Sequence, residues 1–251
     1  MRHILGGQNL ALITHKREEI AGPWAHAVVT DLICEHGCLS SKTTNYHFPL
    51  FLTFDNGMSL RDPKPNLKDR FLRKAAGQLG DASGSLEPRS VFNYIYAILH
   101  SPTYRERYAE FLKMDFPRIP LTSSGELFSR LAELGGDLID LHLLKHEMLA
   151  HPITKFEGMG DGVVRKVRYH EGNRRVYINE TQYFTGVEPK LWEFQIGGYQ
   201  VLYKWLKDRE KVKRKLSYDE IDTYCRIVTA IDETIRLMAE IDRAIPSWPI
   251  E

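Results

Sequence analysis

The feature that most restricts the fold of this chain is a stripe of apolar side chains near its C-terminus. Ser217 and Glu220 stand before the stripe in the spacing of a capping box, which predicts the start of a helix. A helix with one apolar face is stable mainly because that face packs on the rest of the protein. We therefore interpret the stripe as a packing seam rather than a cofactor-binding segment. Its residues follow one another mostly at steps of three and four: Ile221, Tyr224, Val228, Ile231, Ile235, Met238 and Ile245.

Strand-like runs occupy the first part of the chain. Short segments rich in apolar and β-branched residues predict strands at 10–13, 27–34 and 48–54, with a polar loop at 39–47. Together with the helical patterns that follow, they predict an α+β fold. The expected order is a strand-rich N-terminal part, a central helical part, a β-hairpin-containing part and a long C-terminal helix.

Capping and breaking residues divide the helical part. Ser101-Pro102 predicts a helix start, because serine caps helices and proline suits the first helical position. Ser123, three residues before Glu126, predicts a capping box for the next helix. We expect Gly135-Gly136 to break or kink that helix before a further segment at 138–149.

A hairpin is predicted in the third part. Residues 163–169 and 175–178 are strand-like and flank Glu171-Gly172-Asn173, which has the composition of a turn. The sequence thus divides into three parts of one module: residues 1–60, 61–150 and 151–251.

The formal net charge of +1 conceals two charged regions of opposite sign. Thirteen basic and seven acidic residues between Asp161 and Lys215 leave +6, whereas residues 217–251 carry three basic and eight acidic side chains, leaving −5. A basic segment with interleaved aromatic residues suits a nucleic-acid phosphate backbone. The same pattern also fits a solvated face with its aromatic rings turned into the core.

Other functional classes find little support. No run of eighteen apolar residues is present and the N-terminus lacks a signal peptide, while three cysteines favour a reducing, cytoplasmic location. Nucleophile-elbow, phosphate-loop and dinucleotide motifs are absent. His142 and His146 have the spacing of a helical metal pair without a clear third ligand. We expect neither a catalytic nor a metal site.

Two long stretches carry a family resemblance. Residues 91–120 (VFNYIYAILHSPTYRERYAEFLKMDFPRIP) and 192–207 resemble the C-terminal region of type ISP restriction–modification enzymes. These are single-polypeptide enzymes with helicase, adenine methyltransferase and specificity parts. The segment at 229–235 resembles the same region, and the likeness extends from Asn9 onward.

The resemblance implies that this chain recognises the DNA target for activities located elsewhere in a parent enzyme. Residues 1–60 would join it to the methyltransferase part. No residue matches a catalytic motif of the family, so we expect no enzymatic activity and no cofactor in this chain. The resemblance implies S-adenosylmethionine as the cofactor of the parent. The expected partners are double-stranded DNA and the methyltransferase and nuclease/helicase parts of the parent, without a membrane.

We expect the arginines at 165–175 to contact guanine edges, and Asn45 and Asn173 to contact adenine edges. The residues expected to contact phosphates are Lys204, Lys207, Lys211, Lys213 and Arg214. Two alternatives remain open. One is a docking module that contacts DNA little, using the helices at 61–150 and the acidic last helix, and the other is a hydrolase that uses His142, His146 or His151. The predicted DNA-binding residues are Lys42, Asn45, Arg165, Lys166, Arg168, Asn173, Arg174, Arg175, Lys204, Lys207, Lys211, Lys213 and Arg214.

Overall fold

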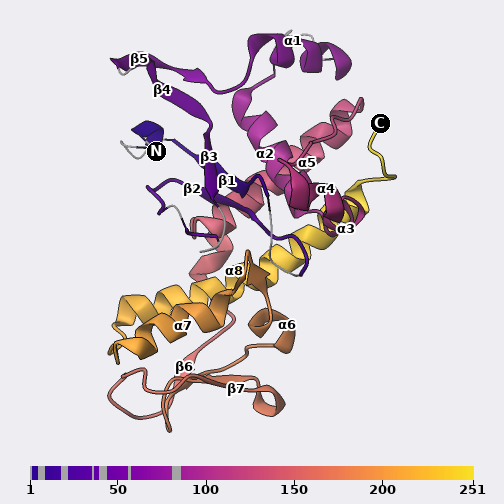
Figure 1. The fold of residues 1–251 in the computed structure, drawn as a ribbon. Helices are drawn as coiled ribbons and strands as arrows, with labels where there is room; N and C mark the ends of the chain where they lie inside the picture. Colours follow the sequence, from indigo (N-terminus) through magenta and orange to yellow (C-terminus); the bar gives the residue numbers. More distant parts are fainter. Residues whose placement is uncertain are drawn as a thin grey trace. The chain divides into compact units, whose positions relative to one another are not determined.

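The computed structural model describes residues 2–4, 9–17, 22–35, 37–39, 44–55, 58–80 and 86–251. Helices and antiparallel sheets both occur, which confirms the predicted α+β class (Figure 1). The chain forms two compact units: unit 1 contains Met1–Leu143 and Arg236–Glu251, and unit 2 contains Leu144–Ile235. Within the described part of the chain, every helix is too short or too polar to cross a bilayer.

Unit 1 begins with a short 3₁₀ helix, η1 (Arg2–Ile4), and two small antiparallel sheets. In the first sheet, β1 (Ala11–His15) lies between β2 (Ala27–Thr30) and β3 (Asn45–Pro49), and β4 (Phe51–Asp55) pairs with β5 (Met58–Pro65) in the second. The predicted loop at 39–47 is wrong at its end, because β3 already begins at Asn45. The buried Asn45 side chain meets the His15 ring at 2.7 Å, which explains how a polar residue is accommodated in this strand.

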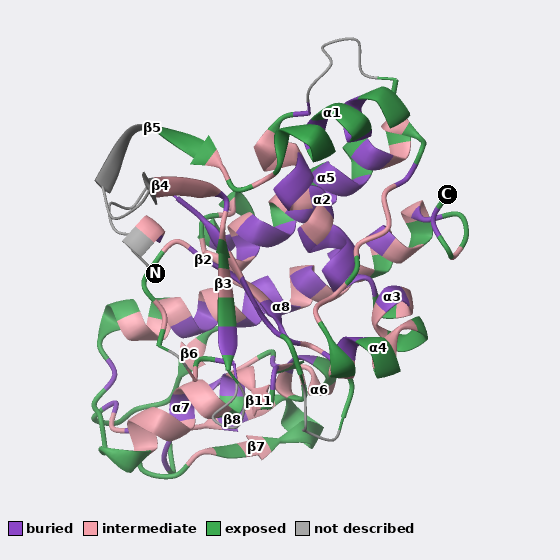
Figure 2. Ribbon diagram, turned by 45° about the horizontal axis from the view of Figure 1, so that its top comes forward, coloured by how far each residue is buried: buried purple, intermediate pink, exposed green. Residues whose placement is uncertain are grey.

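Between the sheets and Leu143, unit 1 contains the described α-helices α1 to α5. The helices α2 and α5 pack against each other and are largely buried (Figure 2). Their core includes Tyr94 and Phe128, whose ring centroids lie 4.9 Å apart. The bounds are α1 (Asp69–Gln78), α2 (Pro88–His100), α3 (Pro102–Arg107), α4 (Ala109–Met114) and α5 (Gly125–His142).

Serine residues cap two of these helices. The Ser101 hydroxyl accepts a hydrogen bond from the Tyr104 N–H group at 3.0 Å, which confirms the predicted start of α3. The predicted cap at Ser123 is wrong, because Ser124 caps α5 with its hydroxyl. The Ser123 N–H group is bonded to the carbonyl of Glu251 at 3.0 Å instead.

The expected break at Gly135-Gly136 is also wrong. Helix α5 runs without interruption through both glycines, and the predicted further helix at 138–149 is its last turn followed by the 3₁₀ helix η2 (Glu147–Ala150). A Cβ atom on Gly135 would lie 2.0 Å from the carbonyl oxygen of Asn93 in α2. The glycine therefore permits the close approach of two helices rather than ending one.

Unit 2 contains a four-stranded antiparallel sheet with the order β6-β9-β8-β7. Strands β7 and β8 flank the 3₁₀ turn η3, which confirms the predicted hairpin, although its first strand is shorter than expected. Before β7, the N–H groups of Arg165 and Lys166 both bond to the carbonyl of Ile178, and Val163 forms a β-bridge with Lys215 instead of continuing the hairpin. The bounds are β6 (Phe156–Glu157), β7 (Arg168–His170), η3 (Glu171–Asn173), β8 (Arg175–Tyr177) and β9 (Tyr183–Phe184).

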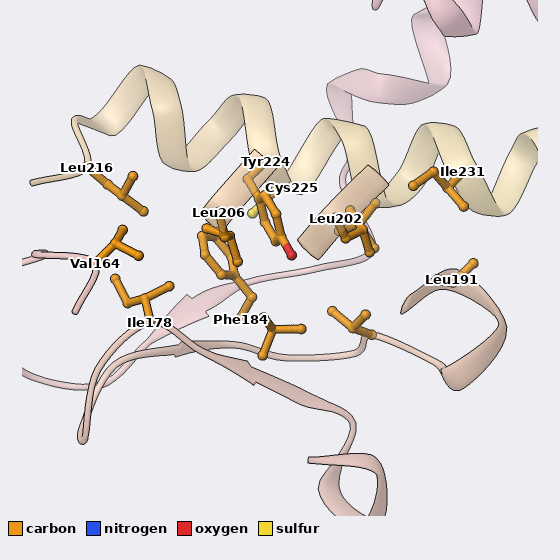
Figure 3. Close-up of a cluster of buried hydrophobic side chains, with 13 residues drawn as sticks. Val164, Ile178, Phe184, Leu191, Leu202, Leu206, Leu216, Tyr224, Cys225 and Ile231 are labelled. Atoms are coloured by element: carbon orange, nitrogen blue, oxygen red, sulfur yellow. The ribbon is translucent and has the colours of Figure 1, made fainter. Parts of the chain in front are cut away.

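A buried cluster joins this sheet to the helices of unit 2 (Figure 3). The Phe184 ring of β9 meets the Tyr224 ring of α8 at 4.2 Å between centroids, and Leu202 and Leu206 of α7 complete the cluster. Tyr224, Val228 and Ile231 are buried here, which confirms the predicted seam of the last helix. The remaining elements are α6 (Pro189–Trp192), β10 (Gln195–Ile196), β11 (Tyr199–Gln200), α7 (Val201–Lys211) and α8 (Tyr218–Ala244).

Candidate nucleic-acid interface

Backbone pairing in unit 2 brings the two halves of the basic segment together. The Val164 N–H group donates to the carbonyl of Arg214 at 2.9 Å, and the Leu216 N–H group donates to the carbonyl of Gly162 at 2.9 Å. The Val167 N–H group donates to the Glu210 carboxylate at 2.8 Å. The segment before the hairpin therefore lies against the end of α7 and the residues after it. We call the charged residues of 161–168 and 204–215 the basic surface.

The lysines of α7 are held by carboxylates on the same helix. Asp208 binds both Lys204 and Lys211, the latter at 3.0 Å, and Glu210 binds Lys207. Hydrogen bonds from Lys204 and Lys211 lower the pKa of Asp208. Such exposed pairs contribute about 0 to 1 kcal/mol each, so exchanging a carboxylate partner for a phosphate costs little.

At the end of the basic surface, two arginines form ion pairs, whereas two lysines form none among the described residues. Arg214 and Arg209 both bind Glu220, at 2.7 and 3.3 Å, and the Arg209 guanidinium also stacks on the half-buried Trp205 ring. Lys213 is exposed in a left-handed backbone conformation (φ 49°), and no ion pair is formed by it or by the exposed Lys215 among the described residues. Lys213 and Lys215 can therefore bind an anion without first breaking an ion pair.

Carboxylates hold two of the predicted hairpin arginines. Arg165 makes a two-pronged contact with Asp161, with one nitrogen–oxygen distance of 2.9 Å, and Arg174 binds Glu188 at 2.7 Å. The bond from Arg165 lowers the pKa of Asp161 strongly, since a cation favours the charged carboxylate. Arg168 is exposed on β7 and forms no ion pair within the described part of the chain.

Arg175 has an aromatic setting. Its guanidinium carbon lies 4.2 Å from the centre of the Tyr183 ring, and its hydrogen bond to Tyr177 lowers the pKa of that hydroxyl. Asn173, at the hairpin turn, is exposed and its amide lies 3.5 Å from the Tyr177 hydroxyl. The sequence placed Tyr177 and Tyr183 only among the interleaved aromatic residues of the basic segment, because their contacts with Arg175 depend on strand register.

A polar hollow of about 660 Å³ opens beside the hairpin. The buried Asn179 holds one wall, because its side-chain oxygen Oδ1 accepts hydrogen bonds from the N–H groups of Thr181 and Gln182 at 3.0 and 2.8 Å. The lining residues are Gly160, Asp161, Arg165, Lys166, Arg168, Asn179, Glu180 and Thr181. Three predicted DNA-binding residues thus line one hollow, and Asn179, Glu180 and Thr181 were not predicted.

Of the two predicted residues in unit 1, one is buried and the other is not described. Asn45 is buried in unit 1 beside His15, and Lys42 lies outside the described residues.

Among the residues described, His142 contacts the Tyr96 hydroxyl at 2.6 Å and His146 caps η2. No group of three His, Cys, Asp or Glu side chains in this described set is arranged to hold a metal ion.

The model of the Type ISP C-terminal specificity domain family matches residues 1–240. Three solved structures have a similar fold: a DrdV–DNA complex, a nuclease-deletion mutant of the Type ISP restriction–modification enzyme LlaGI with a DNA substrate mimic, and the ATP-dependent Type ISP enzyme LlaBIII bound to DNA. Their TM-scores are 0.71, 0.65 and 0.68, and their sequence identities to this chain are 24%, 18% and 16%.

The similar region covers 94%, 98% and 97% of this chain but 25%, 18% and 16% of the DrdV, LlaGI and LlaBIII chains. The chain therefore spans about a quarter or less of these proteins. No curated protein sequence matches it. At these identities the solved structures establish a shared fold.

Proposed function

Since the chain belongs to the Type ISP C-terminal specificity domain family, we propose that it recognises the DNA target sequence of a restriction–modification enzyme. The observation that carries this proposal is the joining of two basic segments by the bridge between Val163 and Lys215. The bridge sets the basic residues that follow α7 beside the segment before the hairpin, which carries Arg165 and Lys166. One such surface can follow a phosphate backbone and present side chains to base edges. That the three similar structures are DNA complexes supports duplex DNA as the partner.

The two parts of the surface have different tasks in this proposal. Lys204, Lys207, Lys211 and Lys213 neutralise phosphates, which supplies affinity without sequence information. The hairpin of β7 and β8 presents arginines beside an exposed turn, and a two-stranded ribbon of this kind fits the major groove.

The chemistry belongs to other parts of a parent enzyme in this proposal. The chain itself acts as a specificity domain without a catalytic step. Methyl transfer from S-adenosylmethionine to adenine, and DNA cleavage, would be performed by methyltransferase and nuclease/helicase parts. The small share of the similar proteins that this chain covers supports such a division.

The combined variant Lys207→Ala/Lys211→Ala/Lys213→Ala tests the phosphate contacts. We expect weaker duplex binding and a plot of log affinity against log salt that is flatter by about three, since each lost phosphate contact removes about 0.9 from the slope. Fluorescence anisotropy with a labelled duplex at several salt concentrations measures both. The matched control is Lys64→Ala/Lys68→Ala/Lys74→Ala, which removes three exposed lysines of unit 1. Identical slopes for the two variants would contradict the assignment.

An apolar surface of unit 1 supports a second proposal, namely docking onto another part of the parent. The Phe116 ring contacts the rings of Tyr46 and Phe48 at 4.9 and 5.4 Å and forms one wall of an apolar hollow of about 310 Å³. Beside it, Phe111 and Met114 are 68% and 58% exposed. A contiguous apolar surface of this kind is typical of a protein contact.

The docking proposal predicts a clear effect of Phe111→Asp. We expect retention of the chain by the separately expressed remainder of the parent to fall about tenfold or more, because an exposed ring that the contact would bury is replaced by a charge. Phe71→Asp is the matched control, since Phe71 is exposed on α1 and does not line the hollow. Equal retention of both variants would speak against docking at this surface.

A further inference from the structure

One face of the sheet in unit 2 carries a row of polar and aromatic side chains. Cross-strand pairing aligns Arg168 with Tyr177, and Tyr177 with Tyr183. Because paired residues point to the same side of a sheet, these three share one face. The opposite face carries the buried Val176 and Phe184, which belong to the core cluster. The first face is therefore the outer one, and Arg175 joins it diagonally through its contact with Tyr183.

Arg175 differs from the other predicted guanine-reading arginines in what holds it. Arg165 and Arg174 give their donors to Asp161 and Glu188. Arg175 forms no ion pair among the described residues, and its guanidinium lies over an aromatic ring instead. Ring stacking restrains the plane of a guanidinium while leaving donors at its edge free.

The setting of Arg175 also restricts its position. Tyr183 supports the guanidinium at 4.2 Å, and the rings of Tyr177 and Tyr183 lie 5.0 Å apart. All three residues are half-buried, and the exposed hairpin turn, Glu171–Asn173, ends two residues before Arg175. An arginine held in this way loses less conformational freedom on binding than a mobile one.

We infer that Arg175 reads the major-groove edge of a guanine, with Tyr183 and Tyr177 as its positioning residues. The inference rests on the proposed function and assigns one base contact within it. Two guanidinium donors other than the one bonded to Tyr177 would meet the O6 and N7 acceptors of guanine, which is the pairing that a planar fork matches. The exposed Arg168, in contrast, has no ring contact among the described residues.

Selection from a random duplex library with the full chain tests the inference. Wild type is expected to enrich a sequence that contains guanine at one position. Arg175→Lys keeps the positive charge but lacks the planar fork, and we expect it to lose that guanine preference by about tenfold or more while the other positions keep theirs. Lys213→Ala is the control, expected to bind all sequences more weakly with an unchanged preference.

Variants of Tyr183 separate positioning from folding. Tyr183→Phe keeps the ring and should retain the guanine preference, whereas Tyr183→Val should lose it at the position that Arg175→Lys affects. Thermal melting of each variant checks that the fold is retained. If wild type enriches a sequence and Arg175→Lys enriches the same one, or weakens all positions alike, the inference is overturned. Failure of wild type to enrich any sequence would instead overturn the proposed function.

Discussion

Gly135→Val is expected to lower the free energy of unfolding of unit 1 by about 3 kcal/mol or more, at the upper end of overpacking substitutions. A Cβ atom at this position would lie 2.0 and 2.7 Å from the carbonyl oxygen and carbon of Asn93, and 3.2 Å from the nitrogen of Ala97. These are backbone atoms of α2, which no rotamer change can move. The helices α2 and α5 would have to separate, and their buried contacts would weaken together. Urea denaturation followed by circular dichroism measures the effect.

Gly77→Ala supplies the matched control. Gly77 lies in α1, and a Cβ atom on it would meet no neighbouring segment of the described chain within 4 Å, so alanine should fit without strain. We expect it to raise the free energy of unfolding by up to about 1 kcal/mol, because alanine is the better helix former. Equal denaturation curves for Gly135→Val and wild type would show that α2 and α5 do not approach as closely as described.

Acid is expected to destabilise unit 1 through two histidines, His100, which is buried, and His142, which is half-buried. Burial lowers the pKa of His142 to about 4, with help from the nearby Arg105 cation, and burial lowers the pKa of His100 well below its usual value. Both rings are therefore neutral in the folded protein at a pH where the unfolded chain binds protons. The free energy of unfolding should be constant with respect to these groups above pH 6.5, the ordinary pKa of histidine.

Below pH 6.5 the unfolded state gains protons that the folded state does not accept, so stability falls as the pH falls toward 4. For His142 alone the full loss is about 3 kcal/mol, since each unit of pKa difference corresponds to about 1.4 kcal/mol. Denaturation curves between pH 6.5 and 5 are the cleanest measurement, because ordinary carboxylates titrate lower. His142→Gln should flatten this dependence, and an unchanged slope in the variant would argue against a neutral buried ring.

Local signals in the sequence predicted those parts of the fold that local physics determines. Ser101-Pro102 marks a real helix start because the capping bond spans three residues, and the hairpin around Gly172 forms because its turn and strands are neighbours in sequence. The seam through Tyr224 and Val228 was predictable because helical periodicity alone shows which face is buried. Each of these features depends on residues close together in the chain.

The errors concern residues whose environment comes from distant segments. The pair Gly135-Gly136 has the composition of a helix break, yet Asn93 on another helix explains the need for glycine there. Asparagine is common in loops and at base contacts, but the Asn45 side chain contacts the buried His15 ring instead. No spacing rule connects such pairs before the register of strands and helices is known.

The candidate site shows the same division. The basic segment was evident from composition, and the spacing of Lys204, Asp208 and Lys211 already indicates ion pairs along one helix face. The setting of Arg175 was not accessible in this way, because its contact with Tyr183 depends on the pairing of β8 with β9. Charge counting therefore located the surface, while strand register distinguished its arginines.

The discontinuous make-up of unit 1 reverses the order in which the two units become complete during synthesis. Unit 2 is a single stretch, Leu144–Ile235, whereas unit 1 needs Arg236–Glu251 as well. The bonds from Thr122 and Ser123 to the carbonyl of Glu251, and from Thr103 to Asp242, cannot form until those last residues have been made. Domains usually fold in order from the N-terminus as they leave the ribosome. Here unit 2, which begins later in the sequence, has all its residues before unit 1 does.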